Sequence, residues 1–326
     1  MRMKNSSPFL SAVLALGAVV LPLSAQTVYT TPAGYVTIDL QPGFNPIGVN
    51  VHNAPVISGQ IDSENGATLT DADVDFSTVL TDANATYLLE INDGPAAGTV
   101  AEIDSNTATT VTVGGAVGAG TASYSIREAM TLTDIFGEGD DLKITGGFTA
   151  NSADTVFLPD GEGGYDSYFY STRGNGFVLT SAPFATPTPI VAFYPNGIIV
   201  QVGSNDPAPF QLFGELKTTP TAVSTVSGFT LLSIPSPVGQ TLASSNLQSF
   251  LSPGFTSTVA DVLYLPDGMG DYDEVFFSSR DNVWRLTSSP FAGDLGSREI
   301  SGALIVERKG SDTSGVFNLP QFIQNL

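Results

Sequence analysis

One 39-residue segment occurs twice in this 326-residue chain. Residues 147–185 and 254–292 align without a gap at an offset of 107, and 22 of the 39 aligned residues are identical. Each copy alternates aromatic and small residues around a glycine-rich turn, a pattern typical of a β-hairpin. The chain therefore contains an internal duplication, and we expect two related β lobes. A repeat constrains architecture and carries no information about chemistry.

The remainder of the chain also reads as β-structure. Strong β formers dominate, Gly and Pro interrupt at short intervals, and no 12-residue window has a clear helical period of apolar residues. Two short segments, 131–137 and 241–251, are predicted to form single helices, each ahead of one copy of the hairpin. The sequence thus predicts an all-β fold with a few short helices.

The two lobes differ in length ahead of the repeated hairpin. The apolar strand at 43–49 resembles the one at 228–234, yet Gly43 precedes Thr131 by 88 residues, whereas Gly228 precedes Thr241 by only 13. The extra residues contain several short strands separated by turns, as in a small barrel or sandwich. We therefore predict the following organisation: a first β lobe at 26–57 plus 129–210, an inserted β-barrel-like domain at 58–128, and a second β lobe at 211–326.

The first 25 residues have the layout of a secretory signal peptide. Arg2 and Lys4 precede an uncharged run, and Leu23-Ser24-Ala25 forms a cleavage site. No later stretch reaches the length of a transmembrane helix, so we expect no membrane-spanning segment once residues 1–25 are removed. These features predict a protein that is secreted or held in the cell envelope, in the periplasm or at the outer surface.

The mature chain is expected to be strongly acidic. The sequence has 32 acidic residues against 11 Lys and Arg, a net charge of −21, and removal of Arg2 and Lys4 makes it −23. Such a charge repels phosphate backbones, so nucleic acid is excluded as a partner. Cysteine is absent, so stability must come from burial rather than from disulfides.

The repeated turn offers one candidate metal site. Its aspartates recur in both copies, and calcium prefers carboxylate and carbonyl oxygens on a flexible loop. However, Glu162 aligns with Met269, which is not a calcium ligand. We therefore interpret the segment as a hairpin turn that needs no cofactor, with calcium as the alternative. The candidate ligands are Asp160, Asp166, Asp267 and Asp273.

Other charged and aromatic positions favour structural roles. Asp71, Asp73 and Asp75 would share one face of an extended strand, where a weak cation patch is the alternative to a solvated surface. Arg173 and Arg280 follow Asp166 and Asp273 by seven residues, so an ion pair within each repeat is expected. The single tryptophan, Trp284, aligns with Phe177 and is expected in the core rather than on a sugar-binding surface.

The sequence has few features that indicate catalysis. His52 is the only histidine, which excludes His-based triads and sites with several His ligands to zinc. The sequence lacks the G-x-S-x-G, H-E-x-x-H and phosphate-loop patterns. With 32 acidic residues, some carboxylate pair falls at a workable distance by chance, so carboxylates alone do not indicate glycoside hydrolysis. We therefore predict no enzymatic activity.

A family resemblance rests on the glycine, proline and aromatic positions. The tract Leu158-Pro159-Asp160-Gly161 with its aromatic strand, the second copy ending in Trp284-Arg285, and the inserted 87–91 and 94–98 segments resemble an uncharacterised family of secreted β-rich proteins. That family occurs as many paralogues in Verrucomicrobia. The resemblance implies a Gram-negative-type envelope or exterior, and it carries over no catalytic residue.

The combined features favour a structural or adhesive protein of the envelope or the extracellular space. A glycan-binding module is the alternative, and an acid polysaccharide hydrolase is less favoured. Exposed aromatic residues beside Asp or Asn in a groove would support glycan binding, whereas two buried carboxylates facing each other in a cleft would support the hydrolase. The sequence carries no signal for the oligomeric state.

Overall fold

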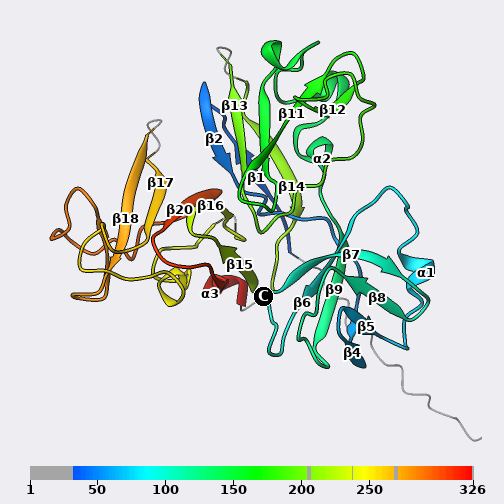
Figure 1. Cartoon of the computed structure of the whole chain (residues 1–326), viewed down its shortest axis with the longest axis horizontal. Coiled ribbons are helices and arrows are strands. Elements are labelled where there is room, and N and C mark those ends of the chain that lie inside the picture. The colour runs from blue at the N-terminus through cyan, green and yellow to red at the C-terminus, as the bar shows by residue number, and fades with distance from the viewer. Residues whose placement is uncertain (1–31, 204–206, 237, 268–270, 325–326) are drawn as a thin grey trace, which may run out of the picture. The chain divides into compact units, whose positions relative to one another are not determined.

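The computed structural model describes residues 32–203, 207–236, 238–267 and 271–324. The expected signal peptide, residues 1–25, lies outside the described residues. In the described part, antiparallel strands dominate and the helices are short, so the prediction of an all-β fold is confirmed (Figure 1). No helix in the described ranges is both long enough and apolar enough to cross a membrane.

The first lobe consists of a five-stranded sheet and a two-stranded sheet. The larger sheet has the order β12-β11-β10-β13-β2, and the smaller one pairs β1 with β14. Helix α2 precedes the hairpin, followed by 3₁₀ turns at Gly139–Asp141 and Ala150–Ser152. The elements are β1 (Ala33–Ile38), β2 (Gly43–Ile47), α2 (Leu132–Phe136), β10 (Thr155–Pro159), β11 (Tyr165–Ser171), β12 (Gly176–Leu179), β13 (Ile198–Val202) and β14 (Phe210–Glu215).

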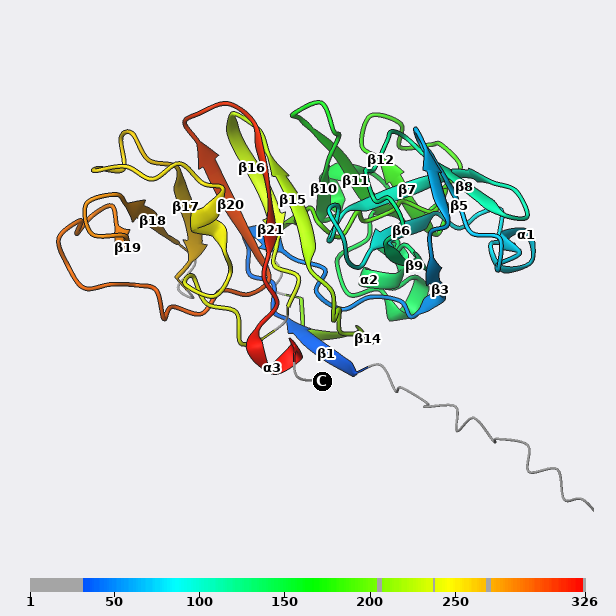
Figure 2. The ribbon, with the colours of Figure 1, turned by 90° about the horizontal axis from the view of Figure 1, so that it is seen from below.

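The second lobe has the same arrangement. Its five-stranded sheet has the order β19-β18-β17-β20-β16, and β15 pairs with β21 (Figure 2). The elements are β15 (Thr221–Thr225), β16 (Gly228–Ser233), a 3₁₀ turn (Leu247–Ser249), β17 (Val262–Pro266), β18 (Tyr272–Ser278), β19 (Val283–Leu286), β20 (Ala303–Arg308), β21 (Thr313–Phe317) and α3 (Gln321–Gln324).

The two hairpins also pair in the same register. Pro159 lies opposite Tyr165 in β10–β11, and Pro266 lies opposite Tyr272 in β17–β18, 107 positions later on both strands. The next pairings, β11 with β12 and β18 with β19, keep the same offset. The two hairpins therefore have the same strand pairings in the same register.

Local chemistry explains why each hairpin turns where it does. The side chain of Asp160 accepts hydrogen bonds from the backbone N–H groups of Glu162 and Gly164, both at 2.8 Å, and Gly161 has a φ of +78°. This is the conformation in which glycine costs least. At the opposite end of the sheet, Asn175 and its counterpart Asn282 occupy the left-handed region, which Asn tolerates better than most residues.

The inserted domain is a curved seven-stranded sheet. Its order is β3-β9-β6-β7-β8-β5-β4, and only Ile61 and Asp62 separate the two end strands β3 and β4. This link connects the two edges of the sheet, because the N–H of Ile61 bonds to the carbonyl of Ala122 before β9 and the N–H of Asp62 bonds to the carbonyl of Thr70 in β5. We call this domain the barrel. The elements are β3 (Pro55–Gln60), β4 (Ser63–Asn65), β5 (Thr68–Thr70), α1 (Phe76–Val79), β6 (Tyr87–Ile91), β7 (Val100–Asn106), β8 (Thr110–Val113) and β9 (Ser123–Glu128).

Each of the three units has its own hydrophobic core, but the barrel also packs on the first lobe. Leu88 of β6 is buried in the core of the first lobe, and Val100 of β7 packs against it. Strand β3 begins at Pro55 rather than at 58, and β14 extends to Glu215, five residues beyond the expected end of the first lobe, because it pairs with β1.

The two helix predictions have different outcomes. Helix α2 forms at 131–137 as predicted, with a reciprocal cap between Thr131 and Asp134. The predicted helix at 241–251 is wrong. Thr241 starts a single turn in which Ser245 donates to its carbonyl, and Asn246 then enters the left-handed region with a φ of +71°, which ends the helical path. The short polar side chains of this segment favour such turns.

Candidate functional site

The aspartates of the repeated turn stabilise the backbone of the turn. Asp160 caps its turn as described above, and Asp267 accepts a hydrogen bond of 3.0 Å from the N–H of Asp271. Both side chains therefore use their oxygens on nearby backbone N–H groups, as in other Asp-Gly turns. This arrangement agrees with the interpretation of the segment as a hairpin turn.

The other two candidate ligands have different surroundings. Asp166 is exposed on β11, where the hydroxyl of Tyr168 lies 3.4 Å from its carboxylate. Its counterpart Asp273 forms an ion pair of 2.5 Å with Arg298. Among the described residues, no group of three or more His, Cys, Asp or Glu side chains is arranged to hold a metal ion.

The acidic run at 71–75 does not form the expected strand. Its residues lie in a turn, because the side chains bond to the local backbone: Asp71 accepts from the N–H of Asp73, and Asp75 caps helix α1 through the N–H of Ser77. Asp71 is buried and accepts a 2.6 Å hydrogen bond from Tyr124. The expectation of three carboxylates on one strand face is therefore wrong.

The expected ion pairs between Arg173 and Asp166 and between Arg280 and Asp273 are also wrong. Asp166 is near the start of the seven-residue strand β11 and Arg173 lies beyond its end. At 3.3 Å per residue, the two are roughly 20 Å apart along the strand.

Trp284, in contrast, is buried and packs edge-on against Phe277, so its prediction as a core residue is confirmed.

Each repeated arginine lies over at least one exposed phenylalanine ring instead. The guanidinium of Arg173 lies 5.0 Å from the ring centre of Phe184, and Phe184 is 6.3 Å from Phe148. Both distances are within the range of favourable cation–π and aromatic contacts. The two rings are 63% and 58% exposed.

The second lobe has the equivalent three residues, but there the arginine contacts both rings. Arg280 lies 5.4 Å from the ring centre of Phe291 and 6.0 Å from that of Phe255. These rings are 73% and 58% exposed, and neither arginine forms a salt bridge with any described residue. We call the two groups the aromatic–arginine clusters. They comprise Phe148, Arg173 and Phe184 in the first lobe and Phe255, Arg280 and Phe291 in the second.

The buried aspartates of the two lobes serve as structural bridges. Asp154 accepts from the backbone N–H groups of Thr145 and Gly203, at 2.7 and 2.9 Å. Its counterpart Asp261 accepts from Ser252 and Lys309 at 2.7 and 2.8 Å. Each aspartate thereby ties the segment before the hairpin to the end of the adjacent strand, β13 or β20.

A buried ionic cluster joins the barrel to the first lobe. Glu90 on β6 is 1% exposed and accepts from Arg127 at 2.7 Å, from Lys217 at 3.2 Å and from the hydroxyl of Tyr194 at 2.7 Å. Burial alone raises the pKa of Glu90, but Lys217 and Arg127 outweigh it and lower this pKa to about 2. The carboxylate is therefore charged at neutral pH and serves as the counter-ion of two buried cations.

The only histidine lies beside this cluster. His52 is 2% exposed and its ring lies 4.3 Å from that of Tyr194. Burial, together with the nearby Arg127, lowers the pKa of His52 to about 3. The imidazole is thus neutral at physiological pH and enclosed by protein.

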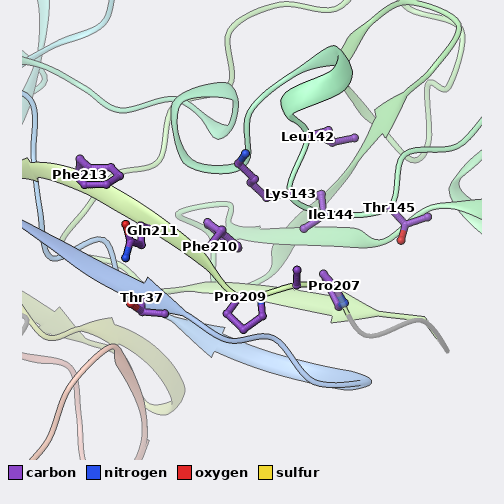
Figure 3. Close-up of a pocket in the computed structure, with 11 residues that line it drawn as sticks. Thr37, Leu142, Lys143, Ile144, Thr145, Pro207, Pro209, Phe210, Gln211 and Phe213 are labelled. Carbon is purple, nitrogen blue, oxygen red and sulfur yellow. The ribbon is translucent and has the colours of Figure 1, made fainter.

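A broad recess of the described part is a groove beside the two-stranded sheet of the first lobe. It has a volume of about 830 Å³. Figure 3 shows Thr37 on β1, Gln211 and Phe213 on β14, and Lys143 on the segment between α2 and β10. None of the described residues that line it is acidic. We call this recess the β14 groove.

A smaller recess, the Asp166 pocket, lies over β10, β11 and β13. Its volume is about 280 Å³. Its lining includes Pro159, Asp166, Tyr168, Ile190 and Phe193, together with Glu102 from β7 of the barrel.

Sequence reasoning did not single out the aromatic–arginine clusters or these recesses. The signal for the clusters was present, because the Phe and Arg positions are identical in both copies. A single sequence does not indicate which of its aromatic residues are exposed, however. No protein-family model, curated protein or solved structure matches this chain. The function must therefore be argued from the surfaces described above.

Proposed function

We propose that this chain is an exported, non-catalytic structural or adhesive β-protein of the envelope or cell exterior. It attaches to its surroundings through the two aromatic–arginine clusters. The observation that carries this proposal is the recurrence of the same exposed Phe, Arg and Phe at the same place in both lobes. The layout of residues 1–25, the strongly acidic composition and the family resemblance support export to the exterior.

The clusters have the composition of contact surfaces. A phenylalanine side chain gains about 1.5–3 kcal/mol when it is fully removed from water, and arginine and aromatic residues are frequent among the residues that dominate interfaces. Four of these rings remain more than half exposed in a chain with its own well-formed cores. Two equivalent contact surfaces on one chain also allow bivalent attachment, which strengthens weak binding without new contacts.

The arrangement of carboxylates supports a non-catalytic role. Asp154 and Asp261 are bonded to backbone N–H groups, and Glu90 neutralises two buried cations. Each of these buried carboxylates therefore has a structural function that accounts for its position. His52 is enclosed by protein, and its pKa of about 3 makes it a weak base, so it is unsuited to general-base catalysis.

The test is a co-sedimentation assay with the mature chain, residues 26–326. The probes are peptidoglycan sacculi and outer-membrane fragments purified from a Gram-negative bacterium. We expect the protein to sediment with at least one of them, Phe184→Ser or Phe291→Ser alone to weaken retention, and the double substitution to lower the apparent affinity at least about tenfold. The matched control is Tyr35→Ser, which removes an equally exposed ring outside the clusters. Equal retention of all variants would contradict the proposal.

Glycan binding is a second candidate, and the β14 groove favours it. The ring of Phe213 is 63% exposed beside Gln211, Thr37 and Lys143, which supply an apolar face together with hydrogen-bonding groups (Figure 3). A glycan array of the mature chain, with and without calcium, separates the two candidates. Specific binding that Phe213→Ala abolishes and Phe184→Ser leaves intact would favour the glycan function.

A further inference from the structure

In the second lobe, an arginine side chain of the same chain fills the site that corresponds to the Asp166 pocket. Asp273 is the counterpart of Asp166, and its carboxylate holds the guanidinium of Arg298 at 2.5 Å. The same guanidinium donates a 3.2 Å hydrogen bond to the carbonyl of Pro266, the counterpart of Pro159. A carboxylate and a carbonyl on adjacent strands thus form a site for one arginine side chain.

The first lobe retains both acceptors but lacks the arginine. The N–H of Leu132 bonds to the carbonyl of Ile190, and the equivalent N–H of Leu242 bonds to the carbonyl of Arg298, so Ile190 occupies the position of Arg298. With the shorter isoleucine there, a recess of about 280 Å³ remains open beside Asp166. Asp166 forms no salt bridge with any described residue.

The open site also gains features that suit a cationic group. Tyr168 replaces Val275 of the second lobe and, with Phe193, provides aromatic surface on which a guanidinium can stack. Glu102, on β7 of the barrel, adds a second carboxylate to the wall. The strong negative charge of the whole chain attracts a basic partner over a longer range.

We infer that the Asp166 pocket binds an arginine side chain of a partner polypeptide, in the way that Asp273 and Pro266 hold Arg298 within the chain. The carboxylate of Asp166 and the carbonyl of Pro159 accept from the guanidinium, and Tyr168 covers its face. This inference adds a specific partner chemistry to the adhesive role, and it does not rest on the aromatic–arginine clusters.

The test is a ¹H–¹⁵N NMR titration of the mature chain with the peptide acetyl-Gly-Arg-Gly-amide. The control peptide carries citrulline, which has the shape of arginine without its charge. We expect the arginine peptide to shift the amide signals of Asp166 and Tyr168, and the citrulline peptide to bind at least about tenfold more weakly, as for the loss of a charged hydrogen bond.

Two substitutions in the first lobe and one in the second make the test reciprocal. Ile190→Arg supplies the missing internal side chain and Asp166→Asn removes the acceptor charge, so each abolishes the shifts. Arg298→Ile opens the second lobe, so the arginine peptide then also shifts the signal of Asp273. The dispersion of the same spectra shows whether each variant is folded.

Three outcomes would overturn the inference. They are equal shifts with the citrulline peptide, unchanged binding by the folded Ile190→Arg protein, and shifts at the pocket caused by calcium or an oligosaccharide but not by the arginine peptide. Failure of the co-sedimentation assay would leave these signals unaffected, so the two proposals fail separately.

Discussion

The two lobes share strand order and register, but they differ in which of their recesses they fill. In the second lobe, Phe250 is 9% exposed and packs edge-on against Phe317, over a glycine in β21. Its counterpart in the first lobe is Lys143, which lies at the open β14 groove. The correspondence is set by Thr145 and Ser252, two residues later, which bond to equivalent buried aspartates.

The Asp166 pocket follows the same rule, with Arg298 in the second lobe and Ile190 in the first. At both places the second lobe closes with its own side chain, whereas the first lobe remains open. The first lobe also carries the barrel and the buried charges that attach it. The comparison teaches that the residues shared by the two lobes maintain the strand order and register. A few residues that differ between the lobes decide which lobe has an open recess that can accept a ligand.

The largest expected effect concerns the attachment of the barrel, which only the first lobe has. Glu90→Gln would leave Arg127 and Lys217 buried without their counter-ion, and we expect a loss of about 3–5 kcal/mol in the free energy of unfolding. Urea unfolding followed by far-UV circular dichroism reports on the whole chain, whereas the fluorescence of Trp284 reports on the second lobe. We expect the dichroism midpoint to move much further than the fluorescence midpoint.

The control for Glu90→Gln is Glu102→Gln, an exposed carboxylate of the same barrel, which should change stability by less than about 0.5 kcal/mol. A coincident shift of both signals in Glu90→Gln would mean that the lobes and barrel unfold as one cooperative unit. The energetic distinction between the two lobes would then be lost.

The next largest effect concerns the β14 groove of the first lobe and the equivalent position that Phe250 fills in the second lobe. Phe250→Ala removes a buried ring from the second lobe and should cost about 3 kcal/mol, whereas Lys143→Ala should change stability by less than about 0.5 kcal/mol. Urea unfolding followed by Trp284 fluorescence measures the first, and circular dichroism measures the second. Similar losses for both variants would show that Lys143 fills the first lobe as Phe250 fills the second.

The sequence was sufficient to predict those parts of the fold that depend on local chemistry. The hairpin turns follow from Asp and Gly at special backbone positions, and helix α2 follows from the pattern that begins with Thr131 and ends with Gly137. The segment at 241–251 has a similar start, but Ser245 bonds to nearby backbone and Asn246 donates to the distant carbonyl of Val316 instead. Propensity alone does not resolve this competition.

The candidate sites were beyond prediction because they depend on contacts between distant segments. Arg173 was assigned to Asp166 by its spacing along one strand, while its true neighbour Phe184 lies in the loop after β12. Arg298 is 25 residues from Asp273, and the difference from Ile190 acquires a meaning only once both lobes are superposed in register. Spacing along one sequence does not reveal such pairings.

The smallest expected effect is a pH dependence that only the first lobe should have, because His52 is the only histidine of the chain. Its folded-state pKa of about 3 lies below the ordinary value of 6.5, so the unfolded chain binds the proton more readily between these values. Stability must therefore fall as the pH falls through this window, by about 2 kcal/mol between pH 7 and pH 5. The lowered pKa of Glu90 acts in the same direction, but in the separate window from about 4.5 down to about 2.

Urea unfolding at pH 7 and pH 5 by circular dichroism should show this loss in the natural chain, and His52→Gln should remove most of it. An equal pH dependence in His52→Gln would assign the effect to carboxylates present in both lobes and would remove this difference between them.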